Sequence, residues 1–475
     1  MPKGWESVVS QLVCTGCGFV FPTEAALPFR CPAAGDGDDI DHVLSRALSA
    51  SSLPFPTGDE QQPFIRYRHL LHLWHFAREH HFTDDAYMQL IRDLDLRLSR
   101  VAGRSLCVTP FLEQSALASS ISSDIGALFV KDETESVAAS HKIRHLFGTW
   151  AHLEIAESLG LVPGARESGV LAIASCGNAA LAAAMVAQAA GRRLRAYLPS
   201  WASPGVKATL AELGAELQIC PRRTDIVGDP SYLSFAAAVA AGEIPFTCQG
   251  TSNSLALDGG RTLAYEIVST LAAEGRRLDR VFLQAGGGAM ASSFIQAFNE
   301  ALSLGALPGP LPRFHAVQSA RNAPLVRAYD CVAARILEKA VKAGSSNEDR
   351  ETTAKLLSTP GVRSIAADVV KNVPRTRSCF MWPWKIPSHS VASGILDDEA
   401  YDWWAVVRGM LDSGGFPIVV DEKVLREAYS IARECTASSV SATGSAGLAG
   451  ALQLARTDAS AMAGENIAII FSGGE

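Results

Sequence analysis

From about residue 125 onward, short apolar runs alternate with alanine-rich segments of helical length. The apolar runs occupy residues 125–130, 170–174, 194–198, 217–220, 281–285, 313–318 and 467–471. Buried parallel strands read as continuous apolar runs because helices cover both faces of the sheet. The alternation therefore predicts an α/β protein with open, doubly wound sheets. In such sheets, ligands bind beyond the carboxyl ends of the strands.

Two turns that suit ligand binding follow strands of this series. Residues 175–178 read Ser-Cys-Gly-Asn after the run at 170–174, and three glycines at 286–288 follow the run at 281–285. Glycines let consecutive backbone amides approach a phosphate at the N-terminus of a helix. A glycine run alone can be a tight turn, but its place between a strand and an amphipathic helix favours an anion site.

A lysine and a serine complete the set. Lys142 lies in Ser-His-Lys-Ile-Arg at residues 140–144, and Ser472 ends the terminal strand in Ser-Gly-Gly. An isolated lysine is most often a solvated charge. Together, however, these four signals are what pyridoxal phosphate (PLP) requires. A lysine bonds to the cofactor, glycine amides hold its phosphate, and a small hydroxyl meets its pyridine nitrogen. The sequence therefore predicts PLP as the cofactor.

These motifs resemble the tryptophan-synthase-type (fold type II) PLP enzymes, and within them the threonine synthase and serine/threonine dehydratase branch. The resemblance covers roughly residues 105–475 and rests on the segments 109–112, 129–133, 140–144, 174–179 and 258–266. It implies two open, doubly wound sheet domains with PLP in the cleft between them. A small cysteine-containing cap precedes them at the N-terminus.

The resemblance also implies roles for individual residues. Cofactor binding falls to Lys142, Asn178, Gly286, Gly287, Gly288, Ala289 and Ser472, and substrate binding to Ser175, Cys176, Gly177 and Ala179. Lys142 and Ser472 are the expected catalytic residues, the lysine as a base beside Cα and the hydroxyl at the ring nitrogen. Two alternatives stay open: Asn178 as a cap of the following helix, and helix packing as the role of Arg144.

The same resemblance implies the domain boundaries. Residues 1–60 form a degenerate zinc-ribbon-like cap. Residues 148–260 form a small α/β domain that carries the Ser-x-Gly-Asn loop, and residues 61–147 and 261–475 form the large PLP-binding domain. Residues 331–390 read as an insertion that could be a lid or an oligomer contact.

Two details favour β-elimination as the reaction. Ser-Gly-Gly at 472–474 and Lys-Ile-Arg at 142–144 resemble the dehydratases more than the threonine synthases. A hydroxyl does not protonate the pyridine nitrogen firmly, so the ring is a milder electron sink, which suits loss of a β-substituent. We therefore expect a lyase that converts a β-substituted amino acid, with a β-hydroxyl as the first choice, to an oxo acid and ammonia.

Other interpretations remain. The cysteine-bearing N-terminal region and the chain length resemble threonine synthases, so a reaction on a γ-phosphorylated amino acid, or a β-replacement, is the alternative. A PLP-binding protein without catalysis is a third. Cys176 stands where racemases of this fold present a serine as second base, which disfavours racemisation without excluding it.

Composition restricts the partners. The chain has 475 residues, 48% of them apolar, with a net charge of −7 and a pI near 5.9, so it carries no electrostatic footprint for nucleic acid. No apolar run approaches the roughly 18–20 residues that a membrane span needs. The first residues lack the apolar core of a secretory signal. We expect a cytoplasmic enzyme with a small-molecule substrate, and a homodimer is a possible assembly.

Three N-terminal cysteines have metal-ligand spacing. Cys14 and Cys17 form one knuckle of a zinc ribbon, but the second knuckle holds only Cys31. Asp36, Asp38 or His42 could substitute for the missing ligand. Because the fourth ligand is unplaced, we predict a ribbon without metal, in which the three cysteines are only weak candidates.

A histidine-rich run follows the cap. It contains His69, His72, His75, His80 and His81. The run has no matching carboxylate pattern, so we interpret it as a polar, solvated or partly packed helix face rather than a metal site.

Overall fold

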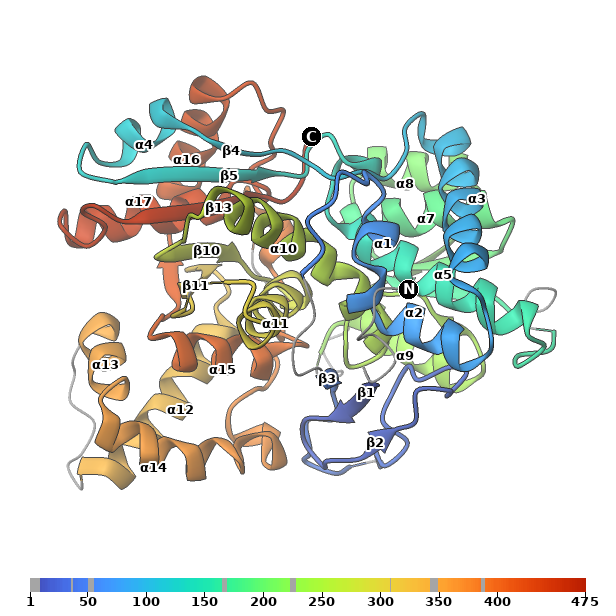
Figure 1. Ribbon diagram of the computed structural model, residues 1–475, viewed down its shortest axis with the longest axis horizontal. Coiled ribbons are helices and arrows are strands. Elements are labelled where there is room, and N and C mark those ends of the chain that lie inside the picture. Colours follow the sequence, from blue (N-terminus) through green and yellow to red (C-terminus); the bar gives the residue numbers. More distant parts are fainter. Residues whose placement is uncertain are drawn as a thin grey trace.

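The protein is described by a computed structural model over residues 9–35, 37–49, 55–164, 169–222, 228–307, 309–341, 349–385 and 389–475. Within these residues three sheets form, of six, four and three strands. Figure 1 shows the six-stranded sheet on the left, a second group of helices around the four-stranded sheet on the right, and the three-stranded sheet below them. The end of the chain lies between the two larger groups.

The six-stranded sheet runs in the order β12-β11-β10-β13-β5-β4. Its strands are β4 (Phe111–Glu113), β5 (Ala127–Asp132), β10 (Arg280–Gln284), β11 (Arg313–Ser319), β12 (Ile418–Val420) and β13 (Asn466–Phe471). All neighbours pair in parallel except β4, which lies antiparallel to β5 at the edge. The central strands are buried along nearly their whole length, as the continuous apolar runs predict.

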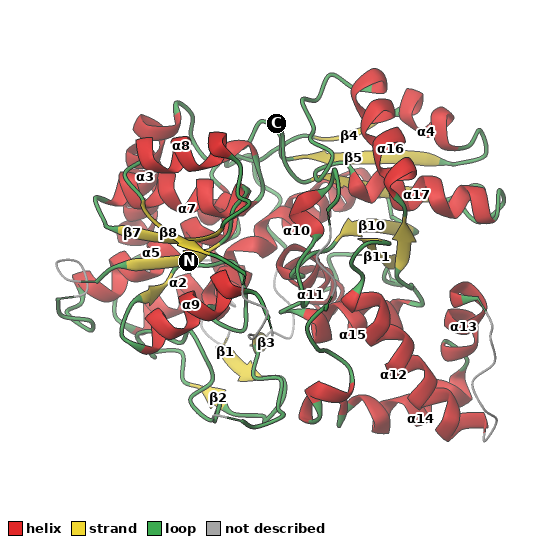
Figure 2. Ribbon diagram, turned by 180° about the vertical axis from the view of Figure 1, so that it is seen from behind, coloured by secondary structure: helices red, strands yellow, loops and turns green. Residues whose placement is uncertain are grey.

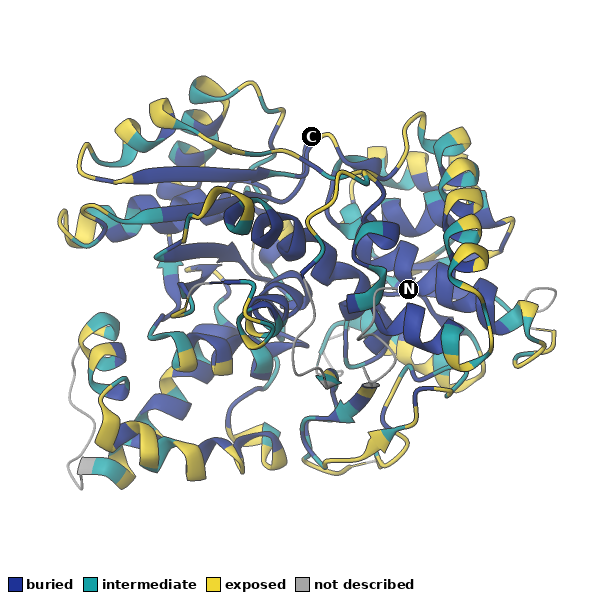
Figure 3. Cartoon of the chain, in the orientation of Figure 1, coloured by how far each residue is buried: buried dark blue, intermediate teal, exposed yellow. Residues whose placement is uncertain are grey.

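Helices cover this sheet on both faces. They include α4 (Ser115–Ile121), α10 (Ser254–Glu274), α11 (Ala289–Ser303), α12 (Pro324–Val341), α15 (Trp403–Ser413), α16 (Glu422–Cys435) and α17 (Ala446–Thr457). The strands and α10 form the darkest, most buried part of Figure 3. Helix α10 lies between the two larger groups and packs on both α5 and α11.

The four-stranded sheet is entirely parallel, in the order β8-β7-β6-β9. Its strands are β6 (Leu171–Ala174), β7 (Leu194–Pro199), β8 (Glu216–Cys220) and β9 (Ile244–Pro245). The helices around it are α3 (Asp84–Ala102), α5 (Lys142–Ser158), α7 (Asn178–Ala190), α8 (Pro204–Glu212) and α9 (Pro230–Ala240). Viewed from behind, β7 and β8 lie among these helices (Figure 2).

The seven predicted strands all form, each within two residues of its expected bounds. Strands β4, β9 and β12 are not predicted from the sequence, because runs of two or three residues carry no periodic signal. Among the described residues, no helix is both long and apolar enough to span a membrane.

The N-terminal cap contains an antiparallel sheet of β1 (Val9–Cys14), β2 (Val20–Phe21) and β3 (Leu44–Ser49). Strand β1 is central, and β3 pairs with it over six residues. This pairing brings the segment before β3 next to the first cysteine knuckle.

The histidine run is partly packed rather than solvated, which is one of the two alternatives expected: His80 is half-buried and His81 exposed, whereas His72 and His75 are buried. After α1 (Pro63–Arg66) and the short helix η2 (Arg68–Leu70), helix α2 (His72–Glu79) is buried through most of its length. The His72 ring is fully buried and lies 3.1 Å from the Ser10 hydroxyl, and His75 bonds to the His69 carbonyl. Burial lowers the pKa of His75 to about 4, so these rings pack as neutral groups.

The region expected as an insertion is mostly helical. It contains the end of α12, then α13 (Arg350–Leu357), α14 (Pro360–Val370) and the single turns η4 (Val373–Arg375) and η5 (Arg377–Cys379). A further turn, η6 (Ser393–Ile395), precedes α15. The segment from η6 to α15 lies on the glycine turn after β10, as described below.

Candidate active site

Lys142 is the first residue of α5, and the end of the chain holds the residues before it. Ser140 forms an isolated antiparallel bridge with Gly473. The backbone N–H of His141 donates to the Ser472 carbonyl at 3.1 Å, and the His141 ring bonds to the same oxygen at 2.8 Å. Ser140 and His141 are buried, whereas Lys142 is half-buried. The lysine is therefore anchored through its neighbours and keeps an accessible side chain.

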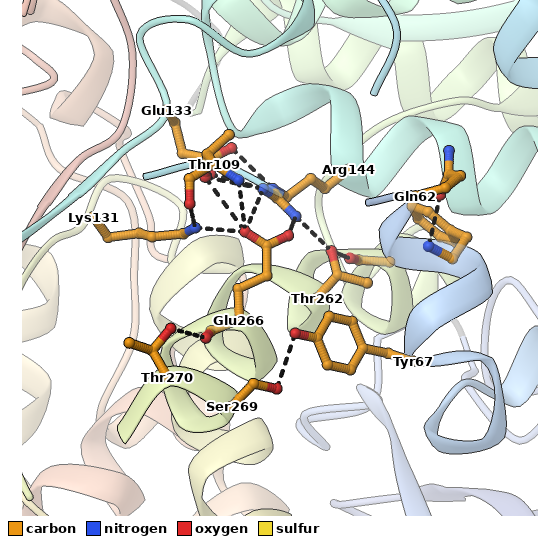
Figure 4. Close-up of polar contacts among 12 residues, drawn as sticks. Gln62, Tyr67, Thr109, Lys131, Glu133, Arg144, Thr262, Glu266, Ser269 and Thr270 are labelled. Atoms are coloured by element: carbon orange, nitrogen blue, oxygen red, sulfur yellow. Dashed lines mark hydrogen bonds and ion pairs between the residues drawn. The ribbon is translucent and has the colours of Figure 1, made fainter. Parts of the chain in front are cut away.

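A buried charge network also fixes the start of α5, through Arg144 in its first turn (Figure 4). The Arg144 guanidinium binds Glu133 in a bidentate fashion, with nitrogen–oxygen distances of 2.8 and 2.9 Å, and also pairs with Glu266 on α10. Lys131 on β5 pairs with Glu266 and donates to the Thr109 carbonyl. All four charged side chains are at most 1% exposed.

The network explains Arg144 and two of the resembling sequence segments. Its two cations and two carboxylates are balanced, as burial of charge requires. Although burial alone would raise it, the Arg144 guanidinium holds the pKa of Glu133 below its ordinary value. Arg144 thus ties α5, β5 and α10 together. Its guanidinium bonds to Thr109, Glu133, Thr262 and Glu266, so its role is in packing these elements together.

The glycine turn connects β10 to α11, as predicted. Gly288 is the N-cap residue of α11 with φ of 93°, a left-handed conformation that favours glycine. A Cβ on Gly286 would lie 2.3 Å from an Asp397 carboxylate oxygen, and one on Gly287 would lie 3.0 Å from the Tyr401 ring. The turn is therefore closely covered by the segment after η6. Ala289 begins the helix and is buried.

An Asp397 carboxylate oxygen lies against this turn. Burial raises the pKa of its carboxyl to about 6, against the opposing effects of the Lys142 charge and of a hydrogen bond from the Gly287 amide. Nearby, the Asp402 backbone N–H donates to the Gly287 carbonyl at 2.9 Å. The Gly287 amide and the Lys142 charge therefore both favour the charged form of this carboxyl.

Ser472 lies at the end of β13 beside the end of β10. The side-chain amide of Gln284, the last residue of β10, donates to the Ser472 hydroxyl oxygen at 2.7 Å. Ser472 is 4% exposed, so this contact is shielded from water. The serine hydroxyl and the glycine turn therefore lie at the carboxyl ends of β13 and β10, and Lys142 lies near the same end of the six-stranded sheet.

The Ser-x-Gly-Asn loop follows β6 and starts α7. Gly177 is the N-cap residue and Asn178 the first helical residue, so the capping role considered for Asn178 is wrong. Asn178 lies against the chain end: a Cβ on Gly473 would be 2.6 Å from its side-chain nitrogen. A Cβ on Gly177 would meet nothing within 4 Å, so this residue faces open space. Ser175, Cys176 and Ala179 are half-buried around it.

Cys176 is a poor base in this environment. Burial, followed by the negative charges of Asp397 and Asp229, raises the pKa of its thiol to about 11. The thiol therefore stays protonated at neutral pH. The same electrostatic effect shows that the loop after β6 and the segment after η6 approach one another.

Several residues of the site escaped prediction from the sequence. Gln284 had a detectable signal, because it is a polar residue at the end of an otherwise apolar buried strand. Asp397, Tyr401 and Asp402 had none, since they lie more than a hundred residues after the glycine turn that they contact.

Comparison with known proteins finds a match to one family. The family described as pyridoxal-phosphate dependent enzyme matches residues 105–473. No curated protein matches the chain in sequence.

Solved structures share the fold at low identity. Maize serine racemase is 18% identical with a TM-score of 0.53, covering 81% of this chain and 94% of its own. Diaminopropionate ammonia lyase from Escherichia coli is 16% identical with a TM-score of 0.56, covering 82% and 89%. Threonine deaminase isoform 2 from Solanum lycopersicum is 15% identical with a TM-score of 0.51, covering 83% and 91%.

Proposed function

Because this chain belongs to the pyridoxal-phosphate dependent enzymes, we propose that it is a lyase. It removes the β-substituent of an amino acid, with a β-hydroxyl as the first choice, and yields an oxo acid and ammonia. The observation that carries this proposal is the hydrogen bond from Gln284 to Ser472, which leaves the serine hydroxyl hydrogen free to point toward a cofactor ring.

The residues present fit PLP. Lys142 would hold the cofactor covalently, Asn178 would bond to its 3′-oxygen, and the amides of Gly286, Gly287, Gly288 and Ala289 would hold its phosphate. The Asp397 carboxylate supports this fit, because one of its oxygens lies against Gly286 and the Gly287 amide favours its charged form. The amides of this turn would hold the cofactor phosphate if Asp397 moved away from the turn.

Ser472 supports elimination because its hydroxyl could donate a hydrogen bond to the pyridine nitrogen of the cofactor. When bound, PLP draws electrons away from the Cα–H bond of the amino acid. A hydroxyl that donates to the ring nitrogen leaves that nitrogen without a full positive charge, so electron withdrawal is mild. Such a ring favours rapid departure of a β-substituent after Cα is deprotonated.

Lys142 would move the proton at Cα. Its side chain is half-buried beside the chain end, so it can be held close to a substrate while water is mostly excluded. The open space at Gly177 and the backbone amides of the loop at 175–179 would bind the substrate carboxylate, at the N-terminus of the thirteen-residue helix α7.

Two features weigh against the competing reactions. Racemisation needs a second base that accepts a proton on the opposite face, and the raised pKa of the Cys176 thiol keeps it protonated. A γ-phosphorylated substrate would meet the negative charges of Asp229 and Asp397, which both act on Cys176. A neutral or cationic β-substituent suits this environment better.

We also propose that the two larger sheets form two domains with the site between them. Every strand of the four-stranded sheet falls within 148–260, and every strand of the six-stranded sheet falls within 61–147 or 261–475. Helices α5 and α10 cross the proposed boundaries after residues 147 and 260, so the division runs through helices rather than loops. Helix α3 lies within 61–147 but packs on α7 beside the four-stranded sheet.

A panel of amino acids tests the function. The purified protein, loaded with PLP, is given serine, threonine, diaminopropionate and phosphohomoserine, and ammonia, oxo acid, free phosphate and inversion of Cα are measured. Ammonia with oxo acid from a β-substituted amino acid supports the lyase. Phosphate release without any oxo acid would replace it with a threonine-synthase-type reaction, and inversion alone with a racemase.

A further inference from the structure

The N-terminal cap brings together four side chains that can bind a metal ion. The Sγ atoms of Cys14, Cys17 and Cys31 and a ring nitrogen of His42 all lie within 4.8 Å of one another. Cys14 and Cys31 are buried, Cys17 is half-buried, and the His42 side chain is 8% exposed. The sequence left the fourth ligand open. In the structure it is His42, which lies just before β3, and the pairing of β3 with β1 brings it next to the first knuckle.

The spacing of the four atoms matches a tetrahedral site. A zinc ion with Zn–S bonds of about 2.3 Å and Zn–N bonds of about 2.0 Å separates two sulfurs by about 3.8 Å and a sulfur and a nitrogen by about 3.5 Å. In the cap, the Cys17 and Cys31 sulfurs are 3.6 Å apart, and the Cys14 sulfur is 3.4 Å from His42 Nδ1. These two distances are opposite edges of the tetrahedron of ligand atoms, and both are close to the values that a central zinc ion requires.

The backbone around the first knuckle also has the form of a ligand loop. The N–H groups of Cys17 and Phe19 point at the sulfurs of Cys14 and Cys17, at 3.5 and 3.4 Å. A Cβ on Gly16 would lie 2.6 Å from the Asp41 carbonyl, so only glycine lets the loop that carries His42 approach so closely. Backbone donors of this kind stabilise thiolate charge.

Asp38 orients the histidine. Its carboxylate lies 3.1 Å from His42 Nε2 and is itself held by the backbone N–H groups of Gly35 and Ile40. A carboxylate on the far nitrogen fixes the ring so that Nδ1 faces the metal, which is the usual support of a metal-bound histidine.

We propose that Cys14, Cys17, Cys31 and His42 bind one Zn²⁺ as a closed structural site, with Asp38 positioning His42. Three thiolates and one imidazole are ligands that zinc prefers, and four protein ligands leave no open position for catalysis. The zinc site is independent of the proposed lyase reaction, because none of its ligands belongs to the PLP site.

The metal site is joined to the segment that covers the glycine turn. Residues 39–41 hold residues 374–378 through four hydrogen bonds: Asp41 N–H to Pro374 O, Arg377 N–H to Asp39 O, and Ser378 N–H and Oγ–H to the Asp39 carboxylate. The donor–acceptor distances of these four hydrogen bonds are 2.7 to 2.9 Å.

Arg377 continues the connection. Its side chain pairs with Asp41 at 3.4 Å and with Glu399, two residues after Asp397. The ion therefore fixes the loop at 38–43, and that loop supports the segment that places Asp397 on Gly287. We infer that loss of zinc loosens this cover.

Metal content of the full-length protein is the direct test. We expect about one zinc ion per chain by elemental mass spectrometry. Cys17→Ser and His42→Ala should each lose it, whereas Cys107→Ser, which changes an exposed cysteine outside the cluster, should keep it. A wild-type protein without zinc, or with iron in its place, would overturn the proposal, as would zinc retained in both ligand variants.

Two milder measurements keep the test valid if the ligand variants do not fold. Asp38→Asn should lower the affinity for zinc about ten- to a hundredfold, measured by competition with a chromogenic chelator. Asn at the exposed Asp59 (Asp59→Asn) should leave that affinity unchanged. Chelator treatment should speed hydrogen exchange in residues 374–378 and 391–402 but not in β13. Unchanged exchange in those segments after zinc removal would show that the cover does not depend on the ion.

Discussion

The side-chain nitrogen of Gln284 lies 2.7 Å from the Ser472 hydroxyl oxygen and also contacts the carbonyls of Gly444 and Ile470, at 2.7 and 3.0 Å. The two carbonyls fix the orientation of the amide, because the opposite orientation would set the amide oxygen against them. An amide nitrogen can only donate, and its two hydrogens are shared among these three oxygens, so Ser472 accepts here and its own hydrogen remains available.

This contact gives the first prediction. Gln284→Glu keeps the shape but replaces the donor with a carboxylate, which would accept the Ser472 hydrogen. Elimination should slow by at least about tenfold, the equivalent of one lost hydrogen bond. Gln318→Glu, at another buried glutamine away from Ser472, is the control for a buried carboxylate. Equal turnover in both variants would remove Gln284 from the site.

Ser472 itself gives the second prediction. Ser472→Asp places a carboxylate at the ring nitrogen and favours a protonated ring, so elimination should slow and a new long-wavelength absorbance should appear with a slow substrate. Ser472→Thr keeps the hydroxyl and should change turnover much less. If the Asp and Thr variants turn over equally, the serine does not contact the ring.

Lys142→Ala should abolish both the absorbance of the lysine-bound cofactor and all turnover while the protein stays folded. Lys142 is at the surface of the site rather than in the core, so circular dichroism and the unfolding midpoint should change little. Lys371→Ala, an exposed lysine remote from the site, is the matched control. Wild-type activity without Lys142 would contradict the assignment of the whole site.

Asp397 gives a prediction about pH. Its pKa in the folded, cofactor-free protein is raised to about 6, above the ordinary carboxyl value. A raised pKa means that the neutral carboxyl is favoured by folding, so this contribution to stability is present at low pH and is lost as the pH rises through about 6. Above that pH the charged carboxylate competes with the cofactor phosphate for the Gly287 amide.

Asp397→Asn should therefore strengthen PLP binding by about tenfold near pH 8, the effect of roughly one pKa unit of interaction. The gain should shrink below pH 6. Asp398→Asn changes the neighbouring carboxylate, which pairs with Arg222 instead, and is the control. PLP titration by fluorescence measures both, and an affinity that does not change in the Asp397 variant would show that the carboxylate moves away at no cost.

The glycine turn should tolerate no side chain. Gly287→Val would push a branched side chain into the Tyr401 ring, 3.0 Å from the Cβ position, and turn the amide away from the phosphate. PLP affinity should fall much more than stability. Gly361→Ala, at a glycine whose Cβ would meet nothing within 4 Å, should affect neither adversely. Unchanged affinity at matched stability would mean that the phosphate binds elsewhere.

The buried network should matter for stability rather than chemistry. Arg144→Met leaves the buried Glu133 without its ion-pair partner and Glu266 with Lys131 alone, and should cost about 3–5 kcal/mol of unfolding free energy. Breaking the exposed Arg104–Glu135 pair with Arg104→Ala should cost less than about 1 kcal/mol. Denaturant unfolding measures both, and similar losses would contradict the role given to Arg144.

The sequence by itself determined the strands and the residues that follow them. Apolar runs between 125 and 471 predicted seven strands because a strand buried on both faces has no polar positions. The same argument placed the turns at 175–178 and 286–288, since both follow a strand directly. Lys142 and Ser472 were predicted as site residues from their local context.

Tertiary structure decided everything that depends on contacts between distant segments. The approach of Asp397 to Gly287, the pairing of Gln284 with Ser472, and the return of His42 to Cys14 join residues 28 to 188 positions apart. No period or motif identifies such pairs: Gln284 stands out in its apolar strand and His42 is one of three candidates for the missing ligand, but neither segment shows which residue it will meet. These side chains acquire a partner only when the sheets close, when burial removes water and makes each unpaired polar group costly.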